Sequence, residues 1–228
     1  RNGAAIYSRG DIVVAGSANR DSSGNYITRT ASVLNESSTI EARRDLTIAA
    51  DTIINKKRVF AAEEQVVGTP ITVTNEQIEP LPGYIRAYRS YTETVEETTV
   101  TANSPAGYVL AGRDMTITAK NIDNEYSIIA AGNNLALDVT VELHNLARRG
   151  AQIITQEGTD ALVRTERWCA GGRVLGVCTR WADREVVDYM PYYETFETVP
   201  SPALPDGAAI IVAGNQLTVN AGAINNIT

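Results

Sequence analysis

The acidic side chains are the first candidates for acid–base chemistry, because sugar-cleaving and other hydrolytic sites use paired carboxylates. Adjacent acidic pairs occur at Glu63-Glu64 and at Glu96-Glu97. Neighbouring residues of a strand face opposite sides of a sheet, so neither pair forms a two-carboxylate site by itself. Asp11, Asp45 and Asp114 precede three expected strands at equivalent positions, which is typical of turn formers. We therefore predict no catalytic residue.

Histidine and cysteine offer little for metal or cofactor chemistry. The chain has one histidine, His144, and two cysteines, Cys169 and Cys178. A tetrahedral metal site would need two more ligands near the cysteines, and a redox motif would need C-x-x-C. The sequence also lacks the P-loop, G-x-G-x-x-G and G-x-S-x-G patterns. We predict no metal site and no cofactor.

Aromatic and arginine side chains gather in two stretches of the chain, and these residue types are enriched at the centres of interfaces. We predict that they form a recognition surface for a protein or a glycan. Its candidate residues are Tyr84, Arg86, Tyr88, Arg89, Tyr91, Trp168, Arg180, Trp181, Tyr189, Tyr192 and Tyr193. The alternative is that these aromatics only pack the two stretches against the rest of the fold.

Charge and hydropathy narrow the class of protein. A net charge of −7 over 228 residues argues against a nucleic-acid partner, which usually meets a basic face. No apolar run approaches the roughly 20 residues that span a bilayer. The chain begins with Arg1 and without a signal peptide, so we expect a piece of a longer protein.

Two compositions are interleaved along the chain. All eight prolines and eleven of the fourteen aromatic residues lie within 56–108 or 147–208. The remaining segments repeat a pattern of small and polar residues, an apolar alternation, and an Ile or Leu before an Asn. The copies are Ala42–Asn55, Ala111–Asn124, Ala131–Asn145 (with one extra residue) and Ala213–Asn226, and a weaker copy spans Ser8–Asn19.

The repeat predicts short strands that stack. Leu46 and Ile48 alternate with Thr47, which places the aliphatic side chains on one face of a half-buried strand. Gly and Asn before each strand tolerate positive φ and favour turns. Ala111 and Ala131 are 20 residues apart where two copies adjoin, and one such unit cannot bury its apolar face alone. We therefore predict an all-β, right-handed parallel β-helix of about 20 residues per coil.

In this fold, equivalent residues lie above one another. Leu46, Met115, Leu135 and Leu217 are expected to share an interior column, and the recurring asparagines are expected to form an amide ladder. The ladder residues are Asn55, Asn124, Asn145 and Asn226. An antiparallel sandwich with coincidental repeats is the alternative fold.

The segment AGRDMTITAKNIDNEYSIIAAGNNLAL resembles the haemagglutinin repeat of very large two-partner-secreted bacterial exoproteins. These include filamentous haemagglutinin adhesins and the effectors of contact-dependent growth inhibition. The resemblance implies export through an outer-membrane transporter, folding outside the cell into a filament, and a place on the bacterial surface.

Export of this kind favours a disulfide between Cys169 and Cys178. The two residues lie in RWCAGGRVLGVCTRW, where a hairpin turning near Gly171-Gly172 brings the sulfurs together. Closing a loop of about ten residues stabilises it by roughly 2–3 kcal/mol in the chain-entropy model.

We expect five segments: β-helix coils at 1–55, 109–146 and 209–228, and β-rich insertions at 56–108 and 147–208, the second with the disulfide. In the first insertion the ascending arm is Val59–Val67 or Ile71–Thr74, and the returning arm is Tyr84–Val100. Insertions on a rigid scaffold commonly carry function.

The predicted function is a structural and binding segment of a secreted filament that presents its insertions to a target-cell receptor, in contact-dependent inhibition or in adhesion. Its expected partners are the secretion transporter, a surface receptor of protein or glycan, and neighbouring coils of the same full-length chain. A passive spacer without a ligand is the alternative. A β-helical polysaccharide-processing enzyme is a further alternative, although the sequence offers no acidic groove for it.

Overall fold

The computed structural model describes residues 4–197 and 204–228, and the regular elements in them are all β-strands. The predicted all-β class is confirmed. Residues 198–203 of the second predicted insertion, with Val199, Pro200 and Pro202, lie outside the described residues. The chain divides into two compact units: unit 1 takes in 1–63, 98–150 and 202–228, and unit 2 takes in 64–97 and 151–201. The five-segment division of the sequence stays a prediction.

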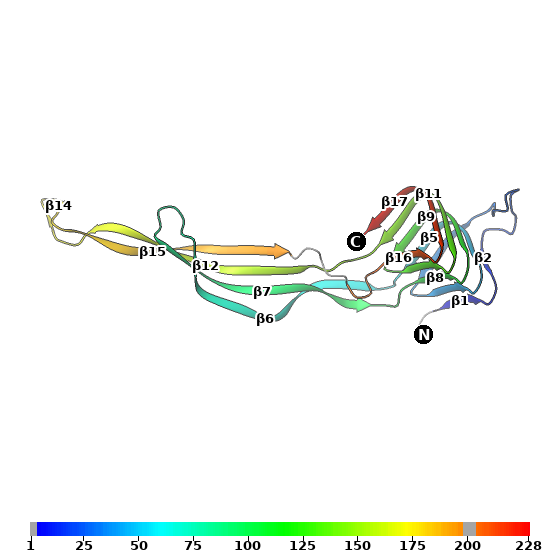
Figure 1. Cartoon of the computed structure of the whole chain (residues 1–228), viewed down its shortest axis with the longest axis horizontal. Helices are drawn as coiled ribbons and strands as arrows, with labels where there is room; N and C mark the ends of the chain where they lie inside the picture. The colour runs from blue at the N-terminus through cyan, green and yellow to red at the C-terminus, as the bar shows by residue number, and fades with distance from the viewer. Residues whose placement is uncertain (1–3, 198–203) are drawn as a thin grey trace. The chain divides into compact units, whose positions relative to one another are not determined.

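Unit 1 contains two parallel sheets, and its stacked strands are visible in Figure 1. One sheet holds short strands, in the order β1 (Ala5–Ser8), β4 (Thr39–Ala42), β8 (Tyr108–Ala111), β10 (Ile128–Ala131) and β16 (Ile210–Ala213). The other holds the long strands β17 (Gln216–Ile227), β11 (Asn134–Leu146), β9 (Met115–Glu125) and β5 (Leu46–Lys56), in that order. The short strand β2 (Ile12–Val14) follows β5, and β3 (Thr30–Glu36) also pairs with β5.

The coils β4–β5, β8–β9, β10–β11 and β16–β17 are each a short strand followed by a long one, whereas the first coil is divided into β1, β2 and β3. The prediction of a parallel β-helix is confirmed. Tyr108 of β8 pairs with Ile128 of β10, which is the predicted spacing of 20 residues. The register shifts between Val139 and Glu142 of β11, where the third copy has its extra residue. The extra residue is thus absorbed as a bulge, and the coils above and below stay in register.

The core of unit 1 is built from columns of like side chains. Leu46, Met115, Leu135 and Leu217 pair in sequence across four coils, as predicted, and Ile12 extends the column. The first three are almost fully buried, whereas Leu217 is half exposed because β17 is an edge strand. Stacking therefore buries apolar surface that a single coil leaves in water.

The glycines that precede the strands are needed for a different reason than the sequence suggested. Gly112, Gly132 and Gly214 are not in the positive-φ region, so the expectation that positive φ explains them is wrong. A Cβ on Gly132 would lie 2.3 Å from the carbonyl oxygen of Gly112, and one on Gly214 would lie 2.1 Å from that of Gly132. Close stacking of successive turns requires glycine here.

An asparagine ladder runs through unit 1. Nδ2 of Asn55 donates to Oδ1 of Asn124 at 2.8 Å, Asn124 donates to Asn145 at 2.8 Å, and Asn145 donates to Asn226 at 2.8 Å. Asn35 also belongs to it, since its Nδ2 donates to Asn55 at 2.7 Å. Asn124 also donates to the Ser127 carbonyl at 2.9 Å, so the ladder satisfies buried turn carbonyls as well.

The sequence analysis missed Asn35 because the first coil is interrupted. Residues 15–29 form a loop between β2 and β3, closed where the Gly16 amide donates to the Thr28 carbonyl at 2.8 Å. The weaker repeat copy, Ser8–Asn19, runs into this loop after β2. The spacing of 20 residues between Asn35 and Asn55 was the available signal.

A second, outer ladder involves the aspartates that the sequence identifies as turn formers. Oδ1 of Asp11 accepts from the Asp45 amide at 3.2 Å, and Oδ1 of Asp45 accepts from the Asp114 amide at 3.3 Å. The Arg113 guanidinium also bonds Asp45, with Nη2–Oδ2 at 2.9 Å. Each aspartate thus binds the turn of the following coil. Burial works to raise the pKa of Asp45, but the hydrogen bonds from Arg113 and the Asp114 amide outweigh it and lower that pKa.

A buried lysine joins the parts of the two predicted insertions that belong to unit 1. Lys57 is 7% exposed, and its Nζ donates to Oδ1 of Asn103 at 2.7 Å and to the Asp206 carbonyl at 2.6 Å. It also lies 5.0 Å from the ring centroid of Phe60, which packs on Tyr126 at 4.5 Å between centroids. Burial lowers the pKa of Lys57.

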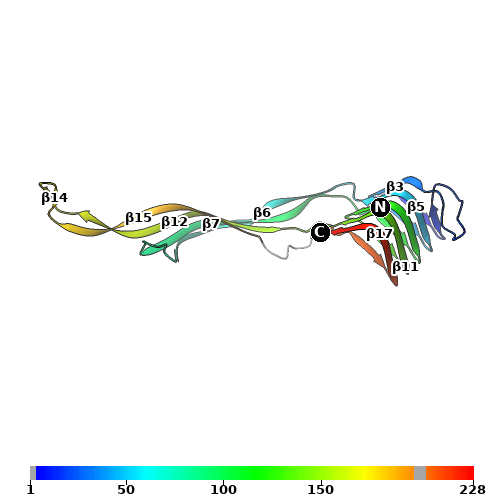
Figure 2. The ribbon, with the colours of Figure 1, turned by 90° about the horizontal axis from the view of Figure 1, so that it is seen from above.

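Unit 2 is built around a four-stranded sheet of long strands (Figure 2). The order is β15 (Trp181–Glu197), β12 (Gln152–Cys169), β7 (Arg86–Asn103) and β6 (Phe60–Ile78), and the first residues of β6 and the last of β7 belong to unit 1. β12 pairs antiparallel with both β15 and β7. A small hairpin of β13 (Arg173–Val174) and β14 (Val177–Cys178) follows β12.

The two insertions are therefore joined rather than separate hairpins, since β7 of the first pairs with β12 of the second over Gln152–Val163. Both alternatives for the ascending arm, Val59–Val67 and Ile71–Thr74, fall almost entirely within the single strand β6. Gly68 and Asn75 adopt positive φ inside β6, so turn-like residues there mark irregularities within one strand.

Candidate binding site

All eleven residues of the predicted recognition surface lie in unit 2. The sheet brings together side chains that are up to about a hundred positions apart in sequence. Directly paired residues of antiparallel strands point to the same face, so the register assigns each candidate to one of two faces. The two faces differ in how many contacts their aromatic side chains make with other side chains of unit 2.

The Gly158 cluster, formed by Arg89, Tyr91, Gly158, Asp160 and Tyr192, occupies one face. Gly158 of β12 pairs with Tyr91 on one side and with Tyr192 on the other. A Cβ on Gly158 would lie 2.0 Å from the Ser90 carbonyl oxygen and 2.6 Å from Tyr91 Cα. The two tyrosine rings meet edge to face, with centroids 6.0 Å apart. Large rings beside a strand glycine compensate for its missing side chain.

Arg89 completes this cluster. Its guanidinium donates to Asp160 through two bonds, Nε–Oδ1 at 2.8 Å and Nη2–Oδ2 at 2.9 Å, and Cζ lies 3.4 Å from the Tyr192 ring centroid. The hydrogen bond to Asp160 raises the pKa of Arg89. The Tyr192 hydroxyl lies 2.8 Å from Oε1 of Gln156 and 2.7 Å from Oε2 of Glu194, and burial followed by the Glu194 bond raises the pKa of Tyr192. These side chains bond to one another and join strands β7, β12 and β15.

Tyr84 has a related packing role. Its hydroxyl lies 3.3 Å from Oδ2 of Asp188 on β15, and Nε of Arg164 donates to the same oxygen at 2.7 Å. The bond from Arg164 lowers the pKa of Asp188. Leu162, which pairs with Asp188, is 1% exposed. Tyr84 therefore bonds across the sheet rather than presenting a free hydroxyl.

The opposite face carries the exposed tyrosines, and we name Tyr88, Tyr189 and Tyr193 the tyrosine strip. Tyr189 is 73% exposed and Tyr193 is 69% exposed, while Tyr88 is half-buried. Tyr88 and Tyr189 flank the small residue Ala161 of β12. Between Tyr88 and Tyr189 the face therefore has little side-chain relief. Arg86, on the same face, forms an ion pair with Glu185.

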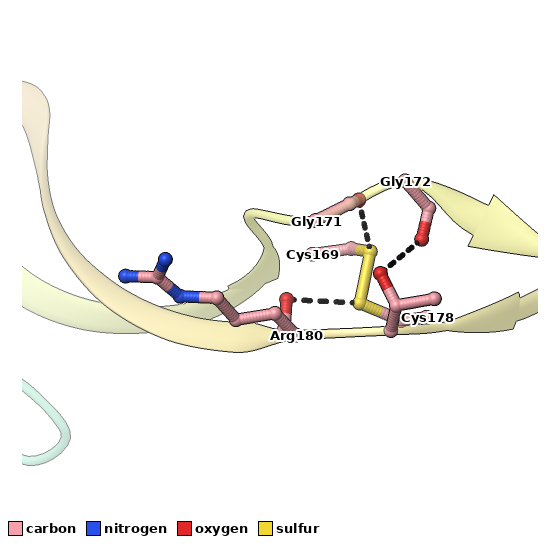
Figure 3. Close-up of a disulfide and its surroundings, with 6 residues drawn as sticks. Cys169, Gly171, Gly172, Cys178 and Arg180 are labelled. Carbon is pink, nitrogen blue, oxygen red and sulfur yellow. Dashed lines mark hydrogen bonds between the residues drawn. A yellow bond between two sulfur atoms is a disulfide. The ribbon is translucent and has the colours of Figure 1, made fainter.

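The remaining candidates lie around the small hairpin. Cys169 and Cys178 form a disulfide with S–S at 2.05 Å and Cα–Cα at 5.7 Å. Figure 3 shows the Arg180 side chain pointing away from the sulfurs. The Arg180 carbonyl accepts from the amides of Ala170 and Gly171 at 2.9 and 3.1 Å. Its backbone thus shapes the loop, while its guanidinium stays exposed.

Both tryptophans are exposed beside this disulfide, and each has an arginine near its ring. Cζ of Arg184 lies 5.3 Å from the Trp168 ring, and Cζ of Arg167 lies 5.9 Å from the Trp181 ring. The sequence analysis did not single out the apolar end of the small hairpin, where Val174, Leu175 and Val177 are exposed. The dipeptide Leu175-Gly176 between two valines was the available signal.

Two hollows among the described residues each have a single carboxylate in their lining. A cavity of about 400 Å³ in unit 1 is lined mainly by alanine, serine and threonine and has one carboxylate, from Glu41. A shallow depression of about 200 Å³ in unit 2 lies beside Thr72, Tyr91 and Glu157. Among residues 4–197 and 204–228, no three His, Cys, Asp or Glu side chains are grouped to hold a metal ion. In that same part of the chain, no helix is long and apolar enough to cross a membrane.

Comparison with known proteins identifies the repeat. The family model for the haemagglutinin repeat matches residues 1–31, 23–101, 89–162 and 203–228. Toxin CdiA of Yersinia pestis is 29% identical over 145 residues, which is 55% of this chain and 4% of that protein's length. The chain therefore spans a small fraction of this relative. No solved structure matches the chain.

Proposed function

The chain belongs to the haemagglutinin repeat family, and from this premise we propose that it is a structural and binding segment of a large secreted bacterial surface filament. Unit 1 is the scaffold of the segment, and unit 2 presents the surface that recognises a receptor on a target cell. The observation that carries the proposal is the separation of residue types: apolar columns in unit 1, and exposed tyrosine, tryptophan and arginine in unit 2.

The scaffold role is supported by β16 and β17, the exposed edge strands of the two sheets of unit 1. β16 and β17 each have one sheet neighbour, and Ile210, Val212, Leu217, Ile224 and Ile227 are exposed along them. Open edges of this kind accept further strands. We propose that neighbouring coils of the same full-length protein stack there and extend the filament.

The recognition role is supported by the tyrosine strip and by the tryptophans. Tyr189 and Tyr193 make no intramolecular ring contact among those of the described residues, unlike Tyr91 and Tyr192. Rigid aromatic side chains of this kind contribute heavily to protein interfaces. The receptor is a protein or a glycan on the target cell, in contact-dependent inhibition or in adhesion. Binding, rather than catalysis, is the proposed activity.

The proposed export route is the outer-membrane transporter of two-partner secretion, which places the segment outside the producing cell. Family membership supports this route, and the disulfide is compatible with an oxidising exterior. The similarity to Toxin CdiA, a protein named as a toxin, favours contact-dependent inhibition over simple adhesion as the role of the full-length protein.

The decisive experiment removes unit 2 and keeps unit 1. Both parts, 64–97 and 151–201, should be deleted together, because β7 pairs with β12 and removing one part exposes a long edge. Described residues beside the cuts are close: the Thr99 hydroxyl lies 3.4 Å from the Glu63 carbonyl, and Gly150 lies against Leu204. Short glycine–serine turns can therefore close each gap.

We expect the shortened protein to keep its strand circular dichroism and to lose saturable binding to Gram-negative target cells. The double substitution Tyr189→Ser and Tyr193→Ser should weaken binding in the full chain, whereas Tyr7→Ser, an exposed tyrosine of unit 1, is the matched control. Unchanged binding by a folded shortened protein would reject the recognition role and leave the passive spacer.

A further inference from the structure

The end of the second insertion, residues 167–182, differs in composition from the rest of the chain, and we name it the tip. It holds three arginines, Arg167, Arg173 and Arg180, and no acidic residue, although the chain as a whole carries −7. It also holds both tryptophans of the protein. Positive charge and indole rings are thus concentrated in one short, disulfide-closed hairpin.

The turn of the tip is apolar and fully exposed. Leu175 is 100% exposed, and Val174 and Val177 beside it are 62% and 70% exposed. Leu175 has φ of 52° and Gly176 has φ of 84°, so both central residues of the turn are left-handed. Asn-Gly is the favoured pair for such a two-residue hairpin turn, and a bulky residue there is strained. Neither folding nor solubility explains a leucine at this position.

The tryptophans lie behind this apolar end, on both faces of the hairpin. Trp181 pairs with Cys169 and Trp168 pairs with Ala182, so the two indoles belong to successive pairs and point to opposite faces. Arg167 lies near the Trp181 ring and Arg184 near the Trp168 ring. Along the hairpin the order is therefore an apolar turn, a disulfide, and then tryptophan with arginine on each side.

We propose that the tip inserts end-on into the interface of an anionic lipid surface on the target cell. Tryptophan favours the boundary between hydrocarbon and headgroups, and arginine binds lipid phosphates through paired hydrogen bonds. The apolar turn enters the acyl region, and the arginines remain at the headgroups. This inference rests on the proposed contact between unit 2 and a target cell, and it names the chemistry of one partner.

The arrangement favours lipid over a protein groove. A groove in a protein is met by one face of a strand or hairpin, whereas this tip is apolar at its end and carries an indole on each side. An apolar medium that surrounds the hairpin contacts the apolar turn and the indoles on both faces at once. Arg173 and Arg180, which have no acidic residue beside them in sequence, complement a negatively charged surface, whereas Arg167 pairs with Asp183 across the sheet.

The two tryptophans make the test direct, because intrinsic tryptophan fluorescence of the whole chain reports on the tip alone. The protein should be titrated with vesicles of equal parts phosphatidylcholine and phosphatidylglycerol, and with vesicles of phosphatidylcholine only. We expect a saturable blue shift with the anionic vesicles that weakens as salt is raised, and a much smaller one with neutral vesicles. Absence of a shift with anionic vesicles would overturn the proposal.

The substitution Leu175→Asn separates binding from folding. Asparagine tolerates the left-handed turn better than leucine, so the hairpin should form at least as well, while vesicle affinity falls on the order of tenfold. Arg173→Gln should lower the affinity about fivefold. Tyr7→Ser, an exposed aromatic of unit 1, is the matched control and should leave vesicle affinity unchanged.

Two outcomes keep this proposal distinct from the recognition role. If deletion of unit 2 abolishes cell binding but the intact protein ignores anionic vesicles, recognition stands and the lipid partner is wrong. Protease treatment of target cells is the complementary test. Loss of Leu175-dependent binding after that treatment would assign the tip to a protein receptor and contradict lipid insertion.

Discussion

The two units obtain their stability in different ways. Unit 1 buries columns of aliphatic side chains and a ladder of asparagines between stacked coils. In unit 2, the buried hydrophobic residues among those described are Ala87, Leu162 and Val163. Its sheet is held instead by cross-strand contacts such as Arg89 with Asp160 and Tyr192. Repetition thus provides a core in one unit, and individual side-chain pairs replace that core in the other.

This difference determines which residues are free to take on function. In unit 1 an interior residue must match the residues above and below it, so substitution disturbs several coils. In unit 2 one face is used for internal bonds through the Gly158 cluster, while the tyrosine strip and the tip have few internal partners. A binding surface can therefore change in unit 2 without loss of the scaffold.

The largest expected effect is on the asparagine ladder of unit 1. Asn124→Ala removes the acceptor of Asn55 and the donor to Asn145 and Ser127, and leaves buried polar groups without partners. We expect a loss of about 3–5 kcal/mol in the free energy of unfolding, measured by urea denaturation. Asn220→Ala, an exposed asparagine that bonds Asp138, is the matched control and should cost no more than about 0.5 kcal/mol. Equal midpoints for both variants would contradict a role of the ladder in stability.

A smaller effect, confined to unit 2, is expected at Gly158. A methyl group there meets the Ser90 carbonyl and Tyr91 Cα, so Gly158→Ala should separate β7 from β12 at a cost of about 2–3 kcal/mol. Hydrogen exchange should accelerate in Thr155–Leu162 and stay unchanged in β9. Gly172→Ala is the control, because no atom lies within 4 Å of its added Cβ. Equal acceleration in β9 would show that the units unfold together.

The disulfide should have an effect that is confined to the tip. Replacing Cys169 and Cys178 by serine removes a cross-link across nine positions, worth about 2–3 kcal/mol in the chain-entropy model. Amides of residues 170–180 should then exchange faster, while the tyrosine strip and unit 1 keep their protection. Treatment of the double variant with a reducing agent should change nothing further. If residues 170–180 kept the exchange rates of the oxidised protein, the cross-link would have no role in ordering the tip.

The repeat of unit 1 could be predicted because one local pattern recurs and each copy constrains the others. Leu46, Met115 and Leu135 occupy equivalent positions in three copies of the repeat, and all three predict the same interior column. The glycines before β9, β11 and β17 were recognised, but the reason for them was not, since the carbonyl that excludes a Cβ belongs to another coil. Asn35 was missed because a loop displaces it from the pattern.

Unit 2 was less predictable because each of its contacts occurs once and is not repeated along the chain. Nothing local in β7 or β12 indicates that Tyr91 and Gly158 lie opposite each other, or that Arg89 reaches Tyr192. The sequence grouped all the aromatic residues as one surface. Only the register separates Arg89, Tyr91 and Tyr192, which contact one another, from Tyr189 and Tyr193, whose rings contact no other ring of the described residues.

The smallest expected effect is the pH dependence contributed by His144 in unit 1. Its Nε2 lies 2.8 Å from Oε1 of Glu142, and this hydrogen bond, with the nearby charges of Glu142, Asp123 and Glu125, raises the pKa of His144 above 6.5 despite partial burial. Because the folded pKa exceeds the unfolded one, the extra stability is fully present below about pH 6.5. It is lost as pH rises through the folded pKa.

For a side chain that is partly in solvent, this gain should be a few tenths of a kcal/mol, within the roughly 0–1 kcal/mol typical of surface pairs. Urea midpoints measured at intervals from pH 5.5 to 8.5 should fall slightly more for the parent chain than for His144→Gln, which keeps a donor to Glu142 but does not titrate. Parallel curves for the two proteins would remove His144 from the pH response. The comparison also tests the contrast between the units, since the change should appear in the exchange of β11 and β17 and not in that of β12.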